Sequence, residues 1–577
     1  MKRWYKYIKP YLAYFIIGPV CMIVEVIGEV VMPKLLSIVI NSANAGTLTV
    51  GSSLGTMCLM VLTALFMLAG GVGGAYFSTK ASVNFGADLR ADVYSKVQTF
   101  SFANIDKFST GSLVTRLTND ITQIQNFINM LLRMALRAPG MMIAALIMAI
   151  MIKPQLSVVF AVSMPLLIIV IAFFIKLSFP RFGAMQSKID SLNSTVQEEV
   201  TNVRVVKSFV REDFGIAKFK KANGDLKAAG ISAMSIMILM QPVMTLFMNG
   251  TVIAVILIGG RIVLNLNMQV GDLSAFITYV TQILSSLLMV TMLFIMSSRA
   301  MASGKRIAEV LDEKVDLNDD NAACRDKKVE SGSIEFRNVS FRYYKNSPDK
   351  VLDDISLTIP NGAMVGIIGS TGCGKTSLVS MIPRLYDCDE GEVIVDGVNV
   401  KDYSLVNLRD GIGMVLQKNT LFSGSIAENL RWGDENASDE EMKKAAGYAQ
   451  ADKFITDFKA GYDTEIEQGG TNVSGGQKQR LCIARALLKK PRILILDDST
   501  SAVDTATEAM IRRAFHEELP GSTKIIIAQR ITSVMDADMI IVMNDGKITG
   551  IGTHDELLSS NSEYREIYES QTGKEAK

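Results

Sequence analysis

Long apolar segments fill the first half of the chain, and short alternating ones fill the second half. Six segments are mostly apolar and reach the roughly 20 residues that an α-helix needs to cross a bilayer. They span residues 12–40, 53–79, 127–152, 155–179, 232–260 and 270–297. After residue 330 the apolar runs are short, and residues 334–344, 351–359 and 364–368 have the pattern of β-strands. The pattern predicts six membrane-spanning helices followed by a separate α/β domain.

The connections between the apolar segments alternate in charge. Connection 41–52 is short and nearly uncharged, whereas connections 80–126 and 180–231 are long and rich in lysine and arginine. Positive charge gathers on the cytoplasmic side, so we expect both termini to be cytoplasmic in a multi-pass protein of the cell membrane. The long connections lack Gly/Pro clusters, which favours helices that continue past the membrane and reverse near residues 109–118 and 209–217.

Two pairs of ionisable residues lie within the apolar segments. Glu25 and Glu29 are four residues apart and so share one helix face, and the same spacing relates Arg133 and Arg137. Charges at membrane depth are costly, so they are usually paired, or they mark the path of a substrate. Two interpretations stay open: the carboxylates pair with Arg133, Arg137 or the backbone, which is the simpler one, or they bind a cationic substrate.

The composition excludes some functions. The formal net charge of +1 gives no general basic field, so a nucleic-acid partner is not expected. Two histidines are too few for a His-rich metal site, and the six cysteines have no CxxC spacing, which favours reduced thiols. The basic, aromatic start, MKRWYKYIKPYL, predicts a short helix lying at the membrane surface.

A glycine-rich loop, GSTGCGKT at residues 369–376, directly follows the predicted strand 364–368 and precedes an apolar helical stretch. A glycine loop between strand and helix binds phosphates, because its backbone N–H groups face them at the helix start. Lys375 is expected to reach the β- and γ-phosphates and Thr376 to ligate Mg²⁺, which predicts ATP and Mg²⁺ as ligands. The expected nucleotide-binding residues of this loop are Gly369, Ser370, Thr371, Gly372, Cys373, Gly374, Lys375, Thr376 and Ser377.

A second acidic element follows another buried strand. In PRILILDDSTSAVD, residues 491–504, the run ILIL ends in Asp497. Open α/β sheets bind ligands at the carboxyl ends of their strands, so Asp497 is expected to hold the metal ion together with Thr376.

The segment TNVSGGQKQR, residues 471–480, resembles the signature motif of ATP-binding-cassette (ABC) ATPases. The resemblance implies that Tyr343 stacks on the adenine, that Gln417 in VLQKNTLF senses and ligates Mg²⁺, and that SAVD, residues 501–504, is the D-loop. The whole chain is similar to a type IV ABC half-transporter. That likeness implies a six-helix transmembrane domain over residues 1–305, a linker over 306–330 and an α/β P-loop nucleotide-binding domain over 331–577. The two regions KFSTGSLVTRLTND and NVRVVKSFVRED resemble the family's cytoplasmic coupling regions.

The signature residues Ser474, Gly475, Gly476 and Gln477 form a second expected anion site, because they lie at a predicted helix start. In the family fold this site is remote from the chain's own phosphate loop. It therefore closes on ATP bound to a second cassette, so that two cassettes enclose two nucleotides.

The sequence departs from the family pattern at the positions that carry the chemistry. Asp498 stands where a hydrolytic cassette has a glutamate that orients water, and Gln529 stands where it has a histidine. A third departure, Gln468, replaces a glutamate that usually contacts the coupling regions. A carboxylate one methylene shorter and a side chain that cannot become cationic predict slow hydrolysis.

We therefore expect a heterodimeric exporter of small, amphipathic or drug-like molecules in the lipid bilayer. In this expectation the chain's own site is degenerate, and its intact signature serves the competent site of a second half-transporter. Three alternatives stay open: an importer of the same fold, a slow homodimer, and a regulatory ATP-binding subunit.

Overall fold

The computed structural model describes residues 2–47, 50–320, 322–345, 347–499 and 502–573, and the chain forms two compact units. The first unit joins Met1–Gln98 with Gly111–Asp312, and the second joins Thr99–Thr110 with Glu313–Lys577. A short stretch from the predicted first coupling region therefore belongs to the unit that contains the ATP motifs.

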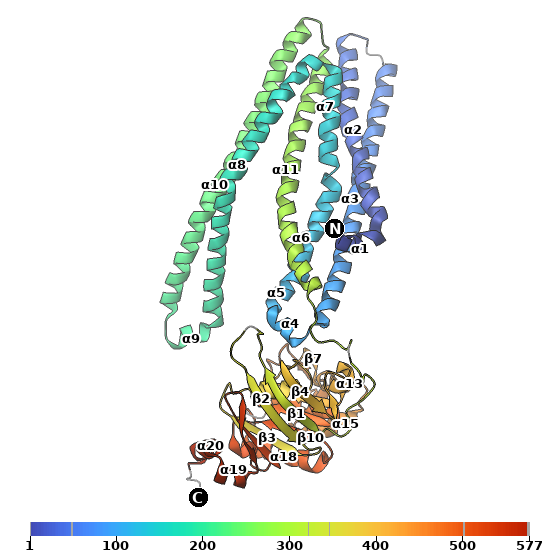
Figure 1. Cartoon of the computed structure of the whole chain (residues 1–577). Helices are drawn as coiled ribbons and strands as arrows, with labels where there is room; N and C mark the ends of the chain where they lie inside the picture. The colour runs from blue at the N-terminus through green and yellow to red at the C-terminus, as the bar shows by residue number, and fades with distance from the viewer. Residues whose placement is uncertain (1, 48–49, 321, 346, 500–501, 574–577) are drawn as a thin grey trace. The chain divides into compact units, whose positions relative to one another are not determined.

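The first unit is a bundle of long helices, labelled α1 to α11 in Figure 1 apart from α4. Its long elements are α2 (Leu12–Asn44), α3 (Val50–Gln98), α6 (Ile121–Met134) with α7 (Arg137–Ile152), α8 (Pro154–Thr201), α10 (Glu212–Leu264) and α11 (Val270–Asp312). Six candidate membrane spans occur in the described residues, which confirms the prediction of a multi-pass, all-α membrane domain. The predicted connection 41–52 includes residues 48–49, which lie outside the described residues.

The helices extend beyond the predicted spans, but they reverse earlier than predicted. Short helices α4 (Phe102–Lys107) and α9 (Val203–Ser208) lie at the two reversals. The predicted turn 209–217 is mostly the start of α10, because Glu212 and Asp213 in its first turn suit the positive end of the helix dipole. The predicted turn 109–118 is likewise helical, in α5 (Thr110–Thr115) and a π-helix (Arg116–Asp120).

Arg133 and Arg137 do not share one helix, contrary to the prediction. The helix is interrupted at residues 135–136, between α6 and α7. Pro139 follows two residues into α7 and has no N–H to donate to the preceding turn, which explains the interruption. Arg133 is exposed, whereas Arg137 turns toward α2.

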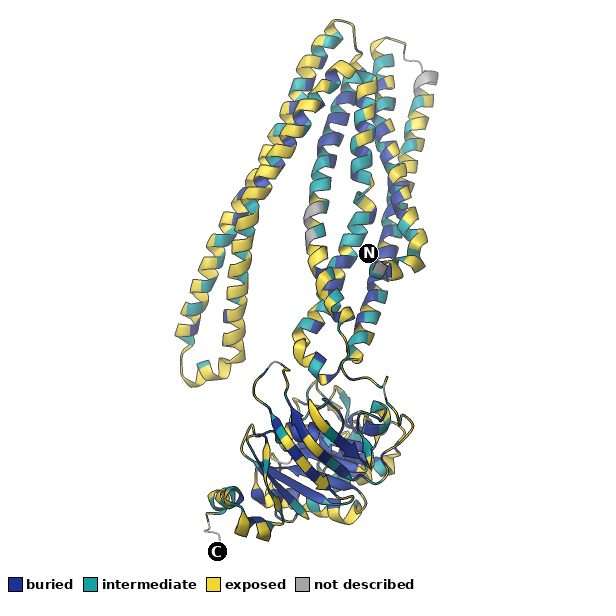
Figure 2. Ribbon diagram, viewed as in Figure 1, coloured by how far each residue is buried: buried dark blue, intermediate teal, exposed yellow. Residues whose placement is uncertain are grey.

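Close packing of α2 against α3 depends on glycines. A Cβ added at Gly70 would lie 2.8 Å from the carbonyl oxygen of Cys21, and one added at Gly74 would lie 2.6 Å from Met22 Cε. Small residues let membrane helices approach closely. This close packing matters because no hydrophobic force drives helices together within lipid. On the outer faces many apolar side chains are exposed, as a lipid-facing surface requires; Figure 2 shows this along α8 and α10.

The second unit contains a parallel-rich sheet and a smaller antiparallel sheet. The six-stranded sheet has the order β12-β11-β3-β10-β9-β6, and the four-stranded sheet has the order β2-β1-β4-β5. The first sheet contains β3 (Met364–Gly369), β6 (Ile412–Val415), β9 (Ile493–Asp497), β10 (Thr523–Ile527), β11 (Met539–Asn544) and β12 (Lys547–Gly552). The second contains β1 (Ile334–Phe341), β2 (Leu352–Ile359), β4 (Glu390–Val395) and β5 (Val398–Asn399), and β7 (Gly424–Ser425) pairs with β8 (Glu465–Ile466).

Helices pack around these sheets, and the apolar faces of the two larger sheets are buried. The helices are α12 (Lys375–Met381), α13 (Leu405–Asp410), α14 (Ile426–Arg431), α15 (Asp439–Tyr448), α16 (Asp452–Asp457), α17 (Gly475–Leu488), α18 (Thr505–Glu518), α19 (His554–Ser560) and α20 (Ser562–Thr572). All five residues of β9 are buried, and the four before Asp497 form the continuous apolar run typical of a central parallel strand. The α/β fold predicted for this half is thereby confirmed.

The side chain of Asp396 links a tight turn to residues 330–333, the segment that leads into β1. Asp396 precedes Gly397 in the turn between β4 and β5, and both residues have positive φ, +49° and +73°, as a type I′ turn requires. Its carboxylate accepts hydrogen bonds from four consecutive backbone N–H groups over residues 330–333. Burial alone raises the pKa of Asp396, but these hydrogen bonds outweigh it and hold the pKa below its usual range.

Replacing Asp396 by asparagine is expected to lower the free energy of unfolding of this unit by about 2 kcal/mol at neutral pH. Asparagine keeps the turn, but its amide nitrogen takes the place of one carboxylate oxygen. This nitrogen accepts no hydrogen bond, so two of the N–H donors lose their acceptor. Because the folded-state pKa is depressed, the lost stabilisation is present above the unfolded-state pKa of about 3.9, and it fades as the pH falls through the folded-state value.

The measurement is urea unfolding followed by Trp432 fluorescence in a Trp4→Phe background, at several pH values. Asp545→Asn is the matched control, because Asp545 precedes Gly546 in the turn between β11 and β12, also with positive φ. A loss of stability at Asp396 that is the same at pH 3 as at pH 7 contradicts the carboxylate's role.

Candidate nucleotide site

The carboxyl ends of three parallel strands meet at one edge of the large sheet. β10 pairs with β3 on one side and with β9 on the other, so that Ile527 lies opposite both Ile367 and Asp497. The glycine loop follows β3, Asp498 follows β9 and Gln529 follows β10. Parallel pairing thus brings together three motifs that are far apart in the sequence.

These motifs line a cavity of about 850 Å³ in the second unit. The predicted residues that line it are Tyr343, Gly369, Ser370, Thr371, Gly372, Gly374, Lys375, Thr376, Ser377, Gln417, Asp497, Asp498 and Gln529. Cys373 belongs to the loop, but its side chain is buried beneath it and does not line the cavity. A volume of this size accommodates a nucleotide.

Glycines shape the phosphate loop. Gly372 and Gly374 have φ of +87° and +97°, a conformation that side chains with a Cβ rarely adopt. A Cβ added at Gly369 would lie 2.1 Å from the carbonyl oxygen of Met543. Lys375 Nζ donates to the carbonyl oxygens of Gly369 (2.8 Å) and Ser370 (2.7 Å), so the ammonium lies at the loop itself.

The residues at the loop and at the end of β9 fit a magnesium ion. The Thr376 hydroxyl donates to Asp497 Oδ1 at 3.0 Å, and Asp497 is 1% exposed. The second carboxylate oxygen, Oδ2, is buried and has no hydrogen-bond partner in the described part of the chain. An orphaned buried carboxylate oxygen beside a hydroxyl is the oxygen donor set that Mg²⁺ takes in nucleotide sites, where it neutralises phosphate charge.

Tyr343 lies at the rim of the cavity on an aromatic cluster. Its ring contacts Phe341 and Tyr386 edge to face, with centroids 4.9 and 5.2 Å away, and its hydroxyl lies 2.8 Å from Ser377 Oγ. The side chain is 41% exposed, so one part of the ring stays accessible for stacking. This position agrees with an adenine contact.

Asp498 and Gln529 are the two residues of the cavity that depart from the family pattern, and they contact each other. Gln529 Nε2 donates to Asp498 Oδ2 at 2.6 Å, and Gln417 also donates a hydrogen bond to Asp498. Burial raises the pKa of Asp498 above its usual range, although both hydrogen bonds oppose the shift. Asp498 has φ of +46°, a conformation that aspartate tolerates better than most residues.

The C-terminal helix contributes residues that the sequence analysis missed. Gln571 on α20 donates to the carbonyl oxygen of Gln529 and accepts from the N–H of Ile531, both at 2.8 Å. Asn544, Glu563, Glu566, Ile567 and Gln571 also line the cavity. No sequence motif contains these residues, because they come close to the loop at 528–531 only in the folded chain.

Gln571→Ala is expected to slow ATP cleavage at this site by about tenfold, since it frees the backbone that positions Gln529. ATP affinity, set mainly by the loop at 369–377, should change by less than about twofold. Single-turnover assays and ATP titration of the full chain separate the two effects. Ser570→Ala, at an exposed position on the same helix, is the control. Equal rates for Gln571→Ala and the control would remove the positioning role.

The signature lies apart from this cavity. Ser474 begins α17 in a capping box, in which its Oγ accepts from the N–H of Gln477 (3.3 Å) and its own N–H donates to Gln477 Oε1 (2.9 Å). Ser474 and Gly475 are exposed, and none of the residues 474–477 lines the cavity. The N–H of Ala502 donates to Gln479 Oε1, which joins α17 to the predicted D-loop; Ser501 lies outside the described residues.

The stretch Thr99–Thr110 packs within the second unit. The ring of Phe102 contacts Tyr386, and the hydroxyl of Tyr386 donates to Asp106 at 2.9 Å. Tyr386 in turn contacts Tyr343, so an aromatic path connects α4 with the rim of the cavity.

Gln468, the third residue that departs from the family pattern, is exposed and does not line the cavity.

Known proteins match both halves of the chain. The model of the ABC transporter transmembrane region matches residues 15–287, and that of the ABC transporter matches residues 352–501. The uncharacterized ABC transporter ATP-binding protein YfiB of Bacillus subtilis is 37% identical over 100% of this chain and 99% of its own length. A fatty acid ABC transporter ATP-binding/permease protein of Mycobacterium bovis is 34% identical, over 83% of this chain and 75% of its own.

A solved structure shares the fold. It is that of a bacterial Atm1-family ABC exporter with ATP bound, with a TM-score of 0.79, 24% identity and coverage of 98% of this chain and 99% of that chain. The chain belongs to the ABC transporters and combines their transmembrane region with their ATPase domain. Such an ATPase domain binds ATP, normally with Mg²⁺, and its family couples ATP hydrolysis to transport.

Proposed function

We propose that this protein is one half of a heterodimeric exporter that uses ATP to move small amphipathic molecules across the cell membrane. The observation that carries the proposal is the contact between Asp498 and Gln529 inside an otherwise complete nucleotide cavity. The loop and Asp497 supply affinity for ATP and Mg²⁺, whereas the pair limits the rate of cleavage at this site.

The physical reason lies in the two side chains. Asp498 is one methylene shorter than a glutamate, and its carboxylate already accepts from Gln529 at 2.6 Å. A misplacement of about 1 Å costs on the order of 100-fold in rate. Gln529 is a neutral amide that takes up no proton, so it offers less to developing negative charge than an imidazolium.

An intact signature on a chain with a slow site favours a different partner. Ser474 and the start of α17 are exposed and away from the chain's own cavity. We propose that they complete the competent site of a second half-transporter, which supplies the glutamate and the histidine missing here. Two identical chains would hold two slow sites and no fast one.

Orientation and direction follow from further observations. The basic connections 80–126 and 180–231 favour a cytoplasmic ATPase domain and cytoplasmic termini. The exposed apolar helices favour cargo that enters from lipid. The likeness to an Atm1-family exporter structure over nearly the whole chain favours export, and the relation to a fatty acid transporter favours amphipathic cargo.

Purification of the chain alone and with its partner tests the proposal. Alone, it is expected to bind ATP with ordinary affinity and to hydrolyse it slowly. With the partner, inside-out vesicles are expected to take up an amphipathic cargo only when ATP is present. Brisk hydrolysis by the chain alone would refute the heterodimer, and ATP-driven loss of cargo from the vesicles would indicate import.

A further inference from the structure

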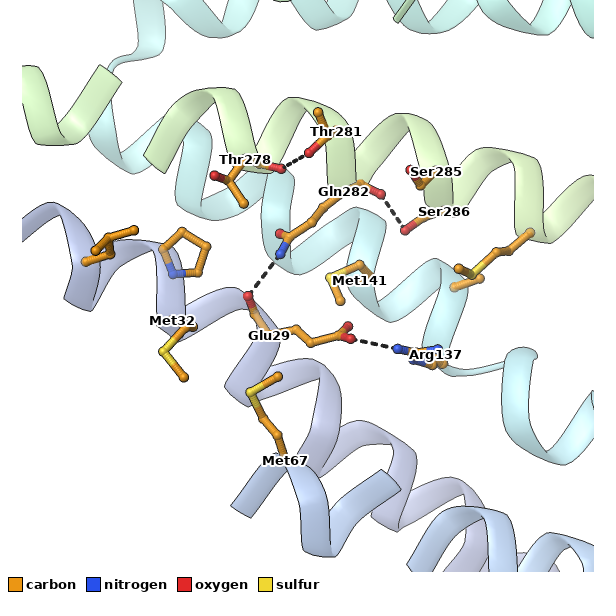
Figure 3. A pocket seen from close by; sticks show the side chains of 14 residues that line it. Glu29, Met32, Met67, Arg137, Met141, Thr278, Thr281, Gln282, Ser285 and Ser286 are labelled. Atoms are coloured by element: carbon orange, nitrogen blue, oxygen red, sulfur yellow. Dashed lines mark hydrogen bonds and ion pairs between the residues drawn. The ribbon is translucent and has the colours of Figure 1, made fainter. Parts of the chain in front are cut away.

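The helix bundle contains a second cavity, of about 450 Å³, that the nucleotide chemistry does not use. It lies within the first unit, where α2, α3, α7 and α11 approach one another (Figure 3). Its lining combines charged and polar side chains, among them Glu29, Arg137 and Gln282, with methionines. Its size suits a small molecule.

The charged cluster of Glu25, Glu29 and Arg137 has one more carboxylate than it has cations. Arg137 pairs with Glu29 at 2.7 Å and with Glu25 at 3.2 Å, so both glutamates pair with an arginine, as the simpler interpretation predicts. Glu29 and Arg137 line the cavity, and Glu25 is connected to it through Arg137. One guanidinium shared by two carboxylates leaves a net charge of −1. The three side chains are only 18–25% exposed, so little water screens this charge.

Two buried acceptor atoms of the cluster have no donor. Glu25 Oε2 and Gln282 Oε1 are buried without a hydrogen-bond partner in the described part of the chain. Arg137 Nε is a buried donor in the same condition. Gln282 Nε2 is used, since it donates to the carbonyl oxygen of Glu29 at 3.0 Å (Figure 3). Unpartnered buried polar atoms are costly, and a donor-bearing ligand satisfies the acceptors.

Hydroxyl groups on α11 add further acceptors. Thr278, Thr281 and Ser286 each donate their proton to a backbone carbonyl of their own helix, at 3.2, 2.8 and 2.7 Å. Their oxygens therefore present lone pairs and no proton to a ligand. The polar side of the cavity thus accepts hydrogen bonds and carries excess negative charge.

Methionines make part of the cavity lining apolar and adaptable. Met32, Met67, Met141 and Met289 line the cavity, and methionine is flexible and polarizable enough to fit ligand bodies of different shapes. A ligand that matches both the polar and the apolar lining has a cationic head with N–H donors and an apolar body.

We propose that this cavity binds a protonated alkyl- or arylamine whose ammonium group lies between Glu29 and the acceptors of α11. As a cargo site, this inference rests on the exporter function proposed above. The ammonium supplies the second positive charge that the carboxylate pair lacks and donates N–H bonds that a trimethylammonium does not. A carboxylate ligand would meet Arg137, but it would also meet Glu29 and the net negative charge of the cluster, and like-charge repulsion disfavours it.

The test is calorimetric binding to the full chain in nanodiscs of neutral lipid without nucleotide. The probes share one body: 4-phenylbutylamine, its trimethylammonium analogue, 4-phenylbutanol and 4-phenylbutyrate. The amine is expected to bind at least about tenfold more tightly than the other three. Equal affinities would overturn the inference, and tightest binding of the butyrate would indicate an anion site on Arg137.

Variants assign the binding to the cavity. Glu29→Gln preserves the volume, and it is expected to weaken amine binding about tenfold. Glu198→Gln, which removes an exposed carboxylate from α8, is the matched control and should change nothing. Thr281→Val keeps the shape but loses an acceptor, and it should weaken the amine about threefold and leave the trimethylammonium unchanged. ATP affinity and helix content verify folding, and unaltered amine binding in Glu29→Gln and Thr281→Val would overturn the assignment.

Transport separates this inference from the exporter function. If ATP drives uptake of another amphiphile into inside-out vesicles but the amine does not bind, only the cavity assignment fails. If the amine binds as expected but no cargo moves with ATP, the exporter function fails and the binding site remains.

Discussion

Replacing Ser474 by alanine is expected to lower the steady-state ATPase rate of the heterodimer by about 100-fold. Ser474 and the N–H groups that begin α17 would face the γ-phosphate of the nucleotide held by the partner, in the site proposed to be competent. Removing the hydroxyl withdraws a donor from the place where negative charge develops. ATP binding at this chain's own cavity should persist, because residues 474–477 do not line it.

Loss of helix capping has to be separated from loss of catalysis. Ser474 caps α17, and a lost cap costs about 1 kcal/mol. Ser438 caps α15 in the same capping-box geometry, with Glu441 in place of Gln477, so Ser438→Ala carries the same structural cost away from any nucleotide. If Ser474→Ala and Ser438→Ala have equal ATPase rates, the composite site is wrong.

Local patterns were enough to predict the elements and most of the nucleotide site. Six apolar segments and the strand at 364–368 depend on hydrophobicity within one stretch of sequence, and they lie close to the observed positions. The residues of the loop at 369–377 are neighbours in sequence; Asp497 ends β9 and Gln529 follows β10, and these two strands are parallel neighbours in one sheet. Parallel strands bring such positions together with no further information.

What the sequence did not reveal depends on contacts between distant segments. Gln571 holds the backbone beside Gln529 only because α20 folds back onto the sheet. The choice of Arg137 over Arg133 depends on the interruption between α6 and α7, which changes the rotation of one arginine relative to the other. The acceptor surface of α11 depends on where each hydroxyl donates its proton, and the sequence pattern does not specify this.

The two sites proposed for this chain divide their tasks by chemistry. The nucleotide cavity has oxygen ligands for a metal ion, a lysine and a glycine loop, but a pair of side chains poorly suited to activate water. The bundle cavity has excess carboxylate and several methionines. In the proposed heterodimer, this chain supplies binding energy for ATP and for cargo, and the glutamate and histidine proposed for the partner supply the speed.

The double variant Asp498→Glu with Gln529→His is expected to raise the rate of ATP cleavage at this chain's own site by about 100-fold. The longer carboxylate reaches one methylene further toward the attacking water, and the imidazole offers a group that can carry positive charge. The backbone that places residue 529 is already held by Gln571 at 2.8 Å, so the new side chain starts from an ordered position.

The measurement is single-turnover cleavage by the full chain, compared with both single variants. Each single change is expected to recover only part of the gain, because Asp498 and Gln529 contact each other and their effects are coupled. Glutamate at 498 has to adopt the positive φ of Asp498, and a strained backbone there would show as lost ATP affinity. If affinity is kept and the rate does not rise, the two residues do not limit this site, and the case for an asymmetric pair loses its chemical basis.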